Sequence, residues 1–165
     1  MDLQDFESQV MYFDLEASQE VDHLLRLGAE RYAEGEAEGC LLQAYALAPN
    51  NLTVLVALYR FYYYQHRYQD ALMIADRAME TVAPIVGFPA SWVDVDFADL
   101  AAGLLESFTM VRFYLLALKG AAYLNFRLGN VAEGVRMLNK VIELDSNDRL
   151  GAKALLHSIG PAAVA

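Results

Sequence analysis

The sequence predicts an all-helical protein built from repeated helix pairs, and three observations support this prediction. Apolar residues recur at steps of three and four along most of the 165-residue chain, which places them on one face of a helix. Strand signals are weak, because β-branched and aromatic residues do not alternate regularly and no Asn-Gly or Asp-Gly hairpin turn occurs. Small residues also recur at a spacing of 34 residues, which is typical of helical repeats.

Composition bounds the size and setting of the protein. A hydrophobic content of 56% over this length predicts one domain, residues 1–165, with a sizeable core. The lone Cys40 excludes an internal disulfide framework and favours a reducing compartment, which we expect to be the cytoplasm. The acidic amino terminus does not resemble an export signal. The longest apolar stretch, residues 100–118, contains Glu106 and Arg112, so we expect no membrane span.

The negative charge is concentrated in the first third of the chain. Residues 1–50 hold 11 carboxylates against Arg26 and Arg31, a net charge of −9, out of −10 for the whole protein. This balance excludes a nucleic-acid partner, which requires a basic surface. The acidic segment is interpreted as a solvated surface, as a steering charge for a basic partner, or as a segment that lies against basic side chains of this chain.

Two helices are expected at the amino terminus. Residues 1–17 are predicted to form the first, and Ser18 is predicted to cap the second, with Glu20 and Asp22 near its positive end. Turns are expected at Pro49-Asn50-Asn51, Gly129-Asn130 and Gly160-Pro161. The apolar residues of the first helix share one stripe: Phe6, Val10, Phe13 and Ala17.

The repeat consists mainly of small residues. They are expected where two helices cross, because a large side chain there would hold the backbones apart. The pattern recurs once more after 63 residues, where Ala71 and Ala78 correspond to Gly134 and Val141. This spacing equals one 34-residue period plus an insertion of 29 residues. The first set of matches pairs Ala37, Ala44 and Pro49 with Ala71, Ala78 and Ala83.

Two stretches, LYRFYYYQHRYQDALMIADRAM and ALKGAAYLNFRLGNVAEGVRMLNKVIELDSND, resemble tetratricopeptide repeat (TPR) units. The second stretch has small, turn and closing residues where the family places them, whereas the first has His66-Arg67 in place of the usual glycine-containing turn. The resemblance implies a right-handed α-α superhelix of about three units. The units are 18–51, which is degenerate, then 52–83 and 115–148, with single helices over 1–17 and 149–160 as caps.

Residues 84–113 form an insertion between the second and third units. Pro84 and Pro89 are expected to break the helical pattern and leave a loop over residues 86–90. Asp94 or Asp96 is then expected to cap a helix. The apolar residues of that helix are Phe97, Leu100, Leu104 and Leu105.

Two aromatic residues of the insertion, Phe88 and Trp92, have alternative interpretations. They are a candidate anchor for a partner, because exposed aromatic side chains bury much area at low entropy cost. The alternative is that they fold back and close one end of the core.

No catalytic, metal or cofactor motif is present. His23, His66 and His157 lie far apart in the sequence, and no phosphate-binding or nucleophile-elbow motif occurs. The carboxylates of Asp94, Asp96 and Asp99 are explained by helix capping. We therefore predict that the protein is not an enzyme.

The TPR resemblance implies a concave groove lined by the first helix of each pair, which binds a protein or peptide segment. Its aromatic and cationic residues favour an acidic segment, although the set does not match the carboxylate clamp of chaperone-binding TPR proteins. The consecutive Tyr62, Tyr63 and Tyr64 are expected to divide between the core and the groove. The expected groove residues are Val56, Arg60, Tyr63, Tyr64, Lys119, Tyr123, Phe126 and Arg127.

Self-association is the alternative function. In that case, the groove of a homodimer would hold the acidic amino-terminal helix of another copy. The blocks MYFDLEAS, GFPASW and VRFYLLALKGAAYL also resemble small bacterial TPR proteins of nitrogen-fixation gene neighbourhoods. That resemblance implies an accessory role at most, since no residue points to nitrogenase chemistry or metal transfer.

Overall fold

The computed structural model describes residues 18–159, and this part of the chain contains eight α-helices and no strand. The all-α class predicted from the sequence is confirmed. The amino-terminal helix predicted over residues 1–17 and the turn predicted at Gly160-Pro161 lie outside the described residues. Among the described helices, none is long and apolar enough to cross a membrane.

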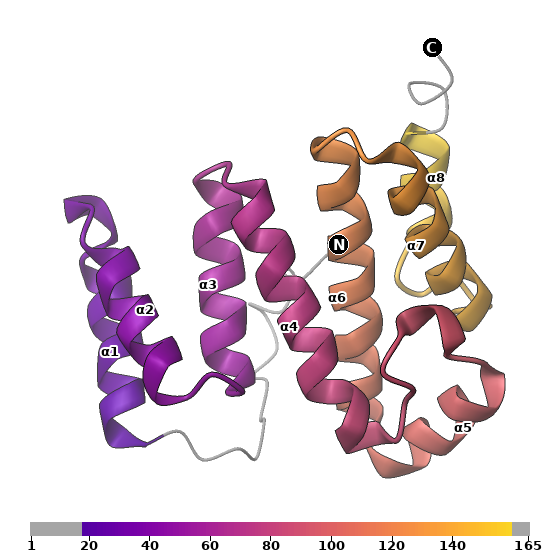
Figure 1. The fold of residues 1–165 in the computed structure, drawn as a ribbon, viewed down its shortest axis with the longest axis horizontal. Coiled ribbons are helices and arrows are strands. Elements are labelled where there is room, and N and C mark those ends of the chain that lie inside the picture. Colours follow the sequence, from indigo (N-terminus) through magenta and orange to yellow (C-terminus); the bar gives the residue numbers. More distant parts are fainter. Residues whose placement is uncertain (1–17, 160–165) are drawn as a thin grey trace.

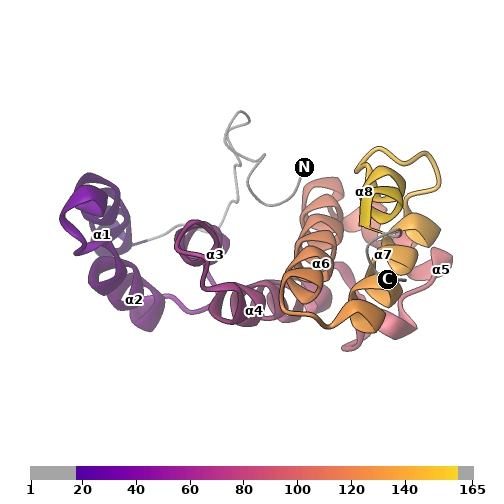
Figure 2. The same cartoon turned by 90° about the horizontal axis from the view of Figure 1, so that it is seen from above.

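The helices run up and down, side by side, along one long axis (Figure 1). Seen from above they follow an arc, with α3 and α6 on its inner side and α4 between them on the outer side (Figure 2). Short 3₁₀ turns cover Tyr32–Glu34 and Trp92–Asp94. The helices are α1 (Gln19–Glu30), α2 (Ala37–Leu47), α3 (Leu52–Tyr64), α4 (Tyr68–Val86), α5 (Phe97–Glu106), α6 (Phe108–Arg127), α7 (Val131–Leu144) and α8 (Ala152–Ile159).

Polar side chains cap the starts of several helices, including Ser18, where the sequence predicts a cap. The Ser18 hydroxyl accepts a hydrogen bond from the Val21 N–H at 3.3 Å at the start of α1. The Asn51 side chain accepts one from the Val54 N–H at 3.2 Å at the start of α3. Each cap pairs a backbone donor that has no partner within the helix. The turn predicted at Gly129-Asn130 separates α6 from α7.

The recurring small residues lie in the core. Ala37, Ala44, Ala71 and Ala78 are buried, and so is Gly134 on α7. A Cβ atom added to Gly134 would lie 2.9 Å from the carbonyl oxygen of Ala122 on α6, closer than real Cβ atoms approach backbone. The expectation that a small residue at the Gly134 position marks a close helix crossing is therefore confirmed.

The break predicted at Pro84 is wrong. Helix α4 continues through Pro84 to Val86 and ends at Gly87, which has a φ of 74°. Pro84 is exposed and lies in the last turn, so the intrahelical hydrogen bond that a proline cannot donate is lost near the end of the helix and not in its middle. The left-handed conformation of Gly87 is what ends the helix.

Helix α5 departs from the pairwise order of the other helices. Helix α4 packs directly against α6, while α5 makes smaller contacts with both and lies beside the lower end of α6, below α7 (Figure 1). Asp96 caps α5, because its side chain accepts from the N–H groups of Ala98 and Asp99 at 2.7 and 2.9 Å. Helix α6 begins at Phe108, within the range 84–113 that the sequence predicts to be an insertion.

Helices α4 and α7 bring carboxylates near one another. Partial burial, together with the nearby Glu80 and Glu133, raises the pKa of Asp76 to about 6 from its ordinary value of 3.8. Asp76 nevertheless remains exposed. We therefore expect its ionised carboxylate to cost little free energy, because water screens the repulsion from Glu80 and Glu133. The folded state thus holds the Asp76 proton more tightly than the unfolded chain does, so ionised Asp76 costs stability above pH 6.

We expect Asp76→Asn to raise the free energy of unfolding at pH 8 by less than about 1 kcal/mol. The gain should shrink as the pH falls through 6 and vanish below the unfolded pKa of 3.8, where aspartate is protonated in both states. Urea unfolding at pH 4 and pH 8 measures it. Glu106→Gln, which removes an exposed carboxylate on α5, is the matched control, and an equal gain in both variants would contradict the prediction.

Candidate functional site

Three tyrosines and one arginine from three helices meet at one end of α3 and α6. We call Tyr63, Tyr68, Tyr123 and Arg127 the tyrosine–arginine cluster. The ring centroid of Tyr63 lies 6.2 Å from that of Tyr123 and 6.0 Å from that of Tyr68. The guanidinium of Arg127 lies 4.5 Å from the centre of the Tyr68 ring and donates a hydrogen bond to the Tyr123 hydroxyl at 3.0 Å. This cation–π and hydrogen-bonded arrangement fixes the orientation of all four side chains.

Electrostatics favour the charged form of the arginine in this cluster. The hydrogen bond to Tyr123 is the largest of the effects that raise the pKa of Arg127 above its already high ordinary value. Arg127 itself is exposed. The cluster therefore presents a permanent positive charge beside aromatic rings, which suits carboxylates and aromatic side chains of a partner.

The three consecutive tyrosines of α3 divide as predicted. Tyr62 is buried, Tyr63 is half-buried within the cluster, and Tyr64 is 53% exposed. Arg67 covers the Tyr62 ring, with its guanidinium 4.5 Å from the ring centre. Tyr64 contacts Tyr63 edge to face, with centroids 5.7 Å apart, and so extends the cluster into solvent.

Lys119 differs from the sequence prediction of an open groove residue. It is 4% exposed, and its ammonium group donates a hydrogen bond to the Leu150 carbonyl oxygen at 2.7 Å. The connection between α7 and α8 covers it. A long aliphatic stem with a terminal charge is compatible with either position, so the sequence pattern does not distinguish an open cation from a covered one.

Phe126 also differs from the prediction. Its ring lies 3.0 Å from the position of a Cβ atom added to Gly134, so it faces α7 rather than the inner side of the arc. Val56 and Arg60 are half-buried on α3, two turns and one turn before Tyr63 and Tyr64, respectively. The structure thus brings together Tyr63, Tyr64, Tyr123 and Arg127, with Val56 and Arg60 on the same helix as the first two.

Of the two interpretations of Phe88 and Trp92, the structure fits the one in which these side chains fold back onto the core. Phe88 is 6% exposed and packs at right angles on Tyr114, with centroids 5.0 Å apart. Trp92 packs against the same core, and the Arg136 guanidinium lies 5.5 Å from the centre of its ring. Both side chains close one end of the core, because the loop turns back after Gly87.

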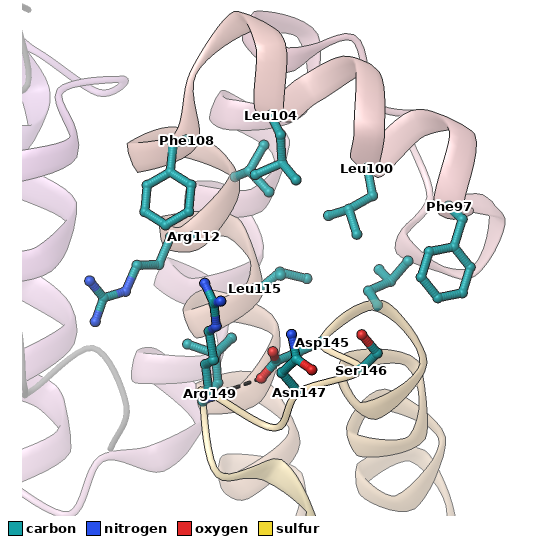
Figure 3. Close-up of a pocket in the computed structure, with 13 residues that line it drawn as sticks. Phe97, Leu100, Leu104, Phe108, Arg112, Leu115, Asp145, Ser146, Asn147 and Arg149 are labelled. Carbon is teal, nitrogen blue, oxygen red and sulfur yellow. Dashed lines mark hydrogen bonds between the residues drawn. The ribbon is translucent and has the colours of Figure 1, made fainter.

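An apolar hollow that sequence reasoning missed lies between α5, α6 and the connection from α7 to α8 (Figure 3). Its volume is about 490 Å³. Phe97 and Phe108 are 54% and 58% exposed at its edges. Arg112 and Arg149 lie on the side of the hollow nearest Phe108 (Figure 3). The apolar lining consists of Phe97, Leu100, Leu104, Phe108, Val111, Leu115, Leu144 and Leu150.

The hollow exists because α5 buries little of its own surface. Only Gly103 of α5 is buried, where an added Cβ would lie 2.7 Å from the Phe88 ring. The other wall is fixed by Asp145, whose carboxylate accepts a hydrogen bond from the Leu150 N–H at 2.7 Å. A signal was present in the sequence: residues 97–106 hold more apolar side chains than one contact face requires.

Titratable ligands do not gather within residues 18–159. No group of three or more His, Cys, Asp or Glu side chains is placed to hold a metal ion in this part of the chain. Cys40 is a free, buried thiol that packs near Gly28 of α1. The side-chain surfaces that stand out are the tyrosine–arginine cluster and the apolar hollow.

The described residues therefore define an all-helical protein with two exposed side-chain surfaces. The chain is 54% identical over 156 residues to an uncharacterized 19.8 kDa protein in the nifW 5′ region of Azotobacter chroococcum mcd 1, a match that covers 94% of this chain and 87% of that protein. The chain belongs to the same family as that protein. No protein-family model matches the sequence, and no solved structure matches it.

Proposed function

We propose that this protein is a non-enzymatic protein-binding module of the TPR-like class. It would bind a segment of a partner protein on the inner side of the helix arc, at the tyrosine–arginine cluster. The observation that carries the proposal is the convergence of Tyr63, Tyr68, Tyr123 and Arg127 from three helices on one partly exposed surface. Tyrosine and arginine are the side chains most enriched where binding energy concentrates in interfaces.

The order of helices supports the TPR-like class. Helices α1 and α2, α3 and α4, and α6 and α7 pack as successive pairs, and buried small residues recur between them. In such an array the first helices of the pairs, here α3 and α6, form the binding surface. Both helices contribute tyrosines to the cluster.

The chemistry of the cluster favours an acidic partner segment with aromatic or apolar residues. Arg127 is exposed and charged, and a carboxylate that contacts it gains a charge-assisted hydrogen bond. The rings of Tyr63 and Tyr123 offer apolar area beside that charge. We further propose an accessory role in nitrogen fixation, which rests on the relative encoded near nifW.

The experiment is site-specific photo-crosslinking in cells of the source organism under nitrogen-fixing conditions. A photoreactive residue replaces Tyr64, which is exposed beside the cluster, and crosslinked proteins are identified by mass spectrometry. The expected result is one dominant partner whose crosslinked peptide is acidic. Arg127→Glu in the same chain should reduce the crosslink at least about tenfold, because a close charge pair becomes repulsive.

Arg26→Glu is the matched control, because it makes the same charge change on exposed α1, far along the arc from the cluster. It should leave the crosslink unchanged. A crosslink that survives Arg127→Glu would place the partner elsewhere on the protein. A crosslink lost equally in both variants would show only an effect of net charge.

A further inference from the structure

The apolar hollow has apolar side chains at its edge that the core does not cover. Phe97 and Leu104 of α5 are 54% and 39% exposed, and Phe108 of α6 is 58% exposed. Leu105, next to Leu104 on α5, is 90% exposed. Apolar side chains gathered around a hollow with a volume of about 490 Å³ are typical of a docking site. A hollow of this size accepts a few large apolar side chains from one face of a helix.

Charge selects among the possible occupants. Arg112 and Arg149 are both exposed and lie on one side of the hollow (Figure 3). Neither makes an ion pair with another of the residues described by the structure. An occupant with an apolar stripe and carboxylates along one edge would pair with both arginines while its stripe fills the hollow.

This chain contains a segment with that chemistry, residues 1–17, which lie outside the described residues. The segment holds five carboxylates and no lysine or arginine. Its sequence predicts a helix in which Phe6, Val10 and Phe13 share one stripe. By helical geometry, carboxylates border that stripe on both sides: Asp2, Asp5 and Glu16 on one side, and Glu7 and Asp14 on the other.

The segment of the same chain is poorly placed to fill the hollow. It joins α1 at Ser18, and α1 lies at the opposite end of the array from α5 (Figures 1 and 2). A helix of 17 residues is about 25 Å long. Helices α3, α4 and α6 lie between α1 and α5 (Figure 1), and packed neighbours are roughly 8–10 Å apart. A helix joined to Ser18 is therefore too short to reach the hollow of its own chain. A second copy has no such restriction.

We propose that the apolar hollow binds the acidic amino-terminal segment, residues 1–17, of a second copy of this chain. The side of the helix with three carboxylates faces Arg112 and Arg149, and Phe6, Val10 and Phe13 enter the hollow. Two copies that exchange these segments form a closed dimer. This surface is separate from the tyrosine–arginine cluster, so the dimer leaves the cluster available.

The test is the mass of the full chain in solution by light scattering and sedimentation over a range of concentrations. The expected result is a shift from 18.4 kDa toward twice that mass as the concentration rises. Arg112→Glu with Arg149→Glu should weaken the dimer at least about tenfold, because two attractive contacts become repulsive. Phe108→Asp should do the same and still fold, since an acidic residue is favoured in the first turn of α6.

A matched control and a rescue keep the test specific. Arg26→Glu with Lys153→Glu makes the same change in net charge at exposed positions outside the hollow and should leave the dimer intact. Changing Asp2, Asp5 and Glu16 to lysine should restore dimerisation when combined with the Arg112→Glu and Arg149→Glu changes. A synthetic peptide of residues 1–17 should compete with the dimer.

Two outcomes would overturn the proposal. The first is a chain that remains monomeric at the highest concentration reached. The second is a dimer that survives both hollow variants but dissociates in Arg127→Glu, which would place the contact at the tyrosine–arginine cluster. The photo-crosslinking result at Tyr64 is independent of either outcome, so failure of this proposal leaves the proposed binding function to its own test.

Discussion

Replacing Lys119 with glutamate is expected to destabilise the protein by about 3–5 kcal/mol, the usual result of an uncompensated buried charge. Lys119 is 4% exposed, and its ammonium donates to the Leu150 carbonyl oxygen at 2.7 Å. A carboxylate there would face that oxygen with no proton to donate. Because this contact ties the α7–α8 connection to α6, the amides of α8 should lose protection against hydrogen exchange first.

The measurements are urea unfolding and hydrogen exchange of wild type, Lys119→Glu and Lys119→Met. The methionine variant keeps most of the apolar volume and loses the charge, so it should cost only about 1–3 kcal/mol. Lys153→Glu is the control, because Lys153 is exposed on α8 and should change stability by less than about 0.5 kcal/mol. Equal effects at positions 119 and 153 would mean that Lys119 is in contact with water.

The fate of Lys119 shows what helical periodicity does and does not determine. The four-residue spacing of Tyr123 and Arg127 predicts that they share a face of α6, and the structure brings them together with Tyr63 and Tyr64. Lys119 lies one turn before Tyr123 on the same helix. The burial of Lys119 depends on the path of the chain after α7. The hydrogen bond from the Leu150 N–H to the Asp145 carboxylate fixes that path, and the spacing of the repeat does not predict it.

The insertion shows a second limit on what can be predicted from the sequence. Capping of α5 by Asp96 follows from local sequence, since an aspartate before an apolar run accepts backbone N–H groups. The position of the helix does not, because it depends on Gly103 meeting Phe88 and on α4 continuing past Pro84. The apolar hollow arises from that position, so the sequence alone shows an amphipathic helix without its partner.

Close helix contact is the feature of the repeat that the sequence predicts best. It can be tested at Gly134, because the same glycine-to-alanine change should lower the stability there and raise it at an open helix position. Gly134→Ala is expected to destabilise the protein by about 1–3 kcal/mol through overpacking, although alanine alone favours a helix over glycine by about 1 kcal/mol. The new Cβ would lie 2.9 Å from the Ala122 carbonyl oxygen and 3.0 Å from the Phe126 ring. Backbone on α6 cannot move aside as a flexible side chain would, so α6 and α7 must separate.

Gly39→Ala is the matched control for the same chemical change. Gly39 is an exposed helical residue of α2 with no atom within 4 Å of an added Cβ, so alanine there should stabilise the protein by about 0.5–1 kcal/mol. Both variants are compared in one series of urea titrations. If both stabilise, α6 and α7 are not in close contact at Gly134, and the buried small residues do not mark the helix crossings on which the repeat interpretation depends. Opposite signs would tie the recurrence of small residues in the sequence directly to the spacing of helices in the fold.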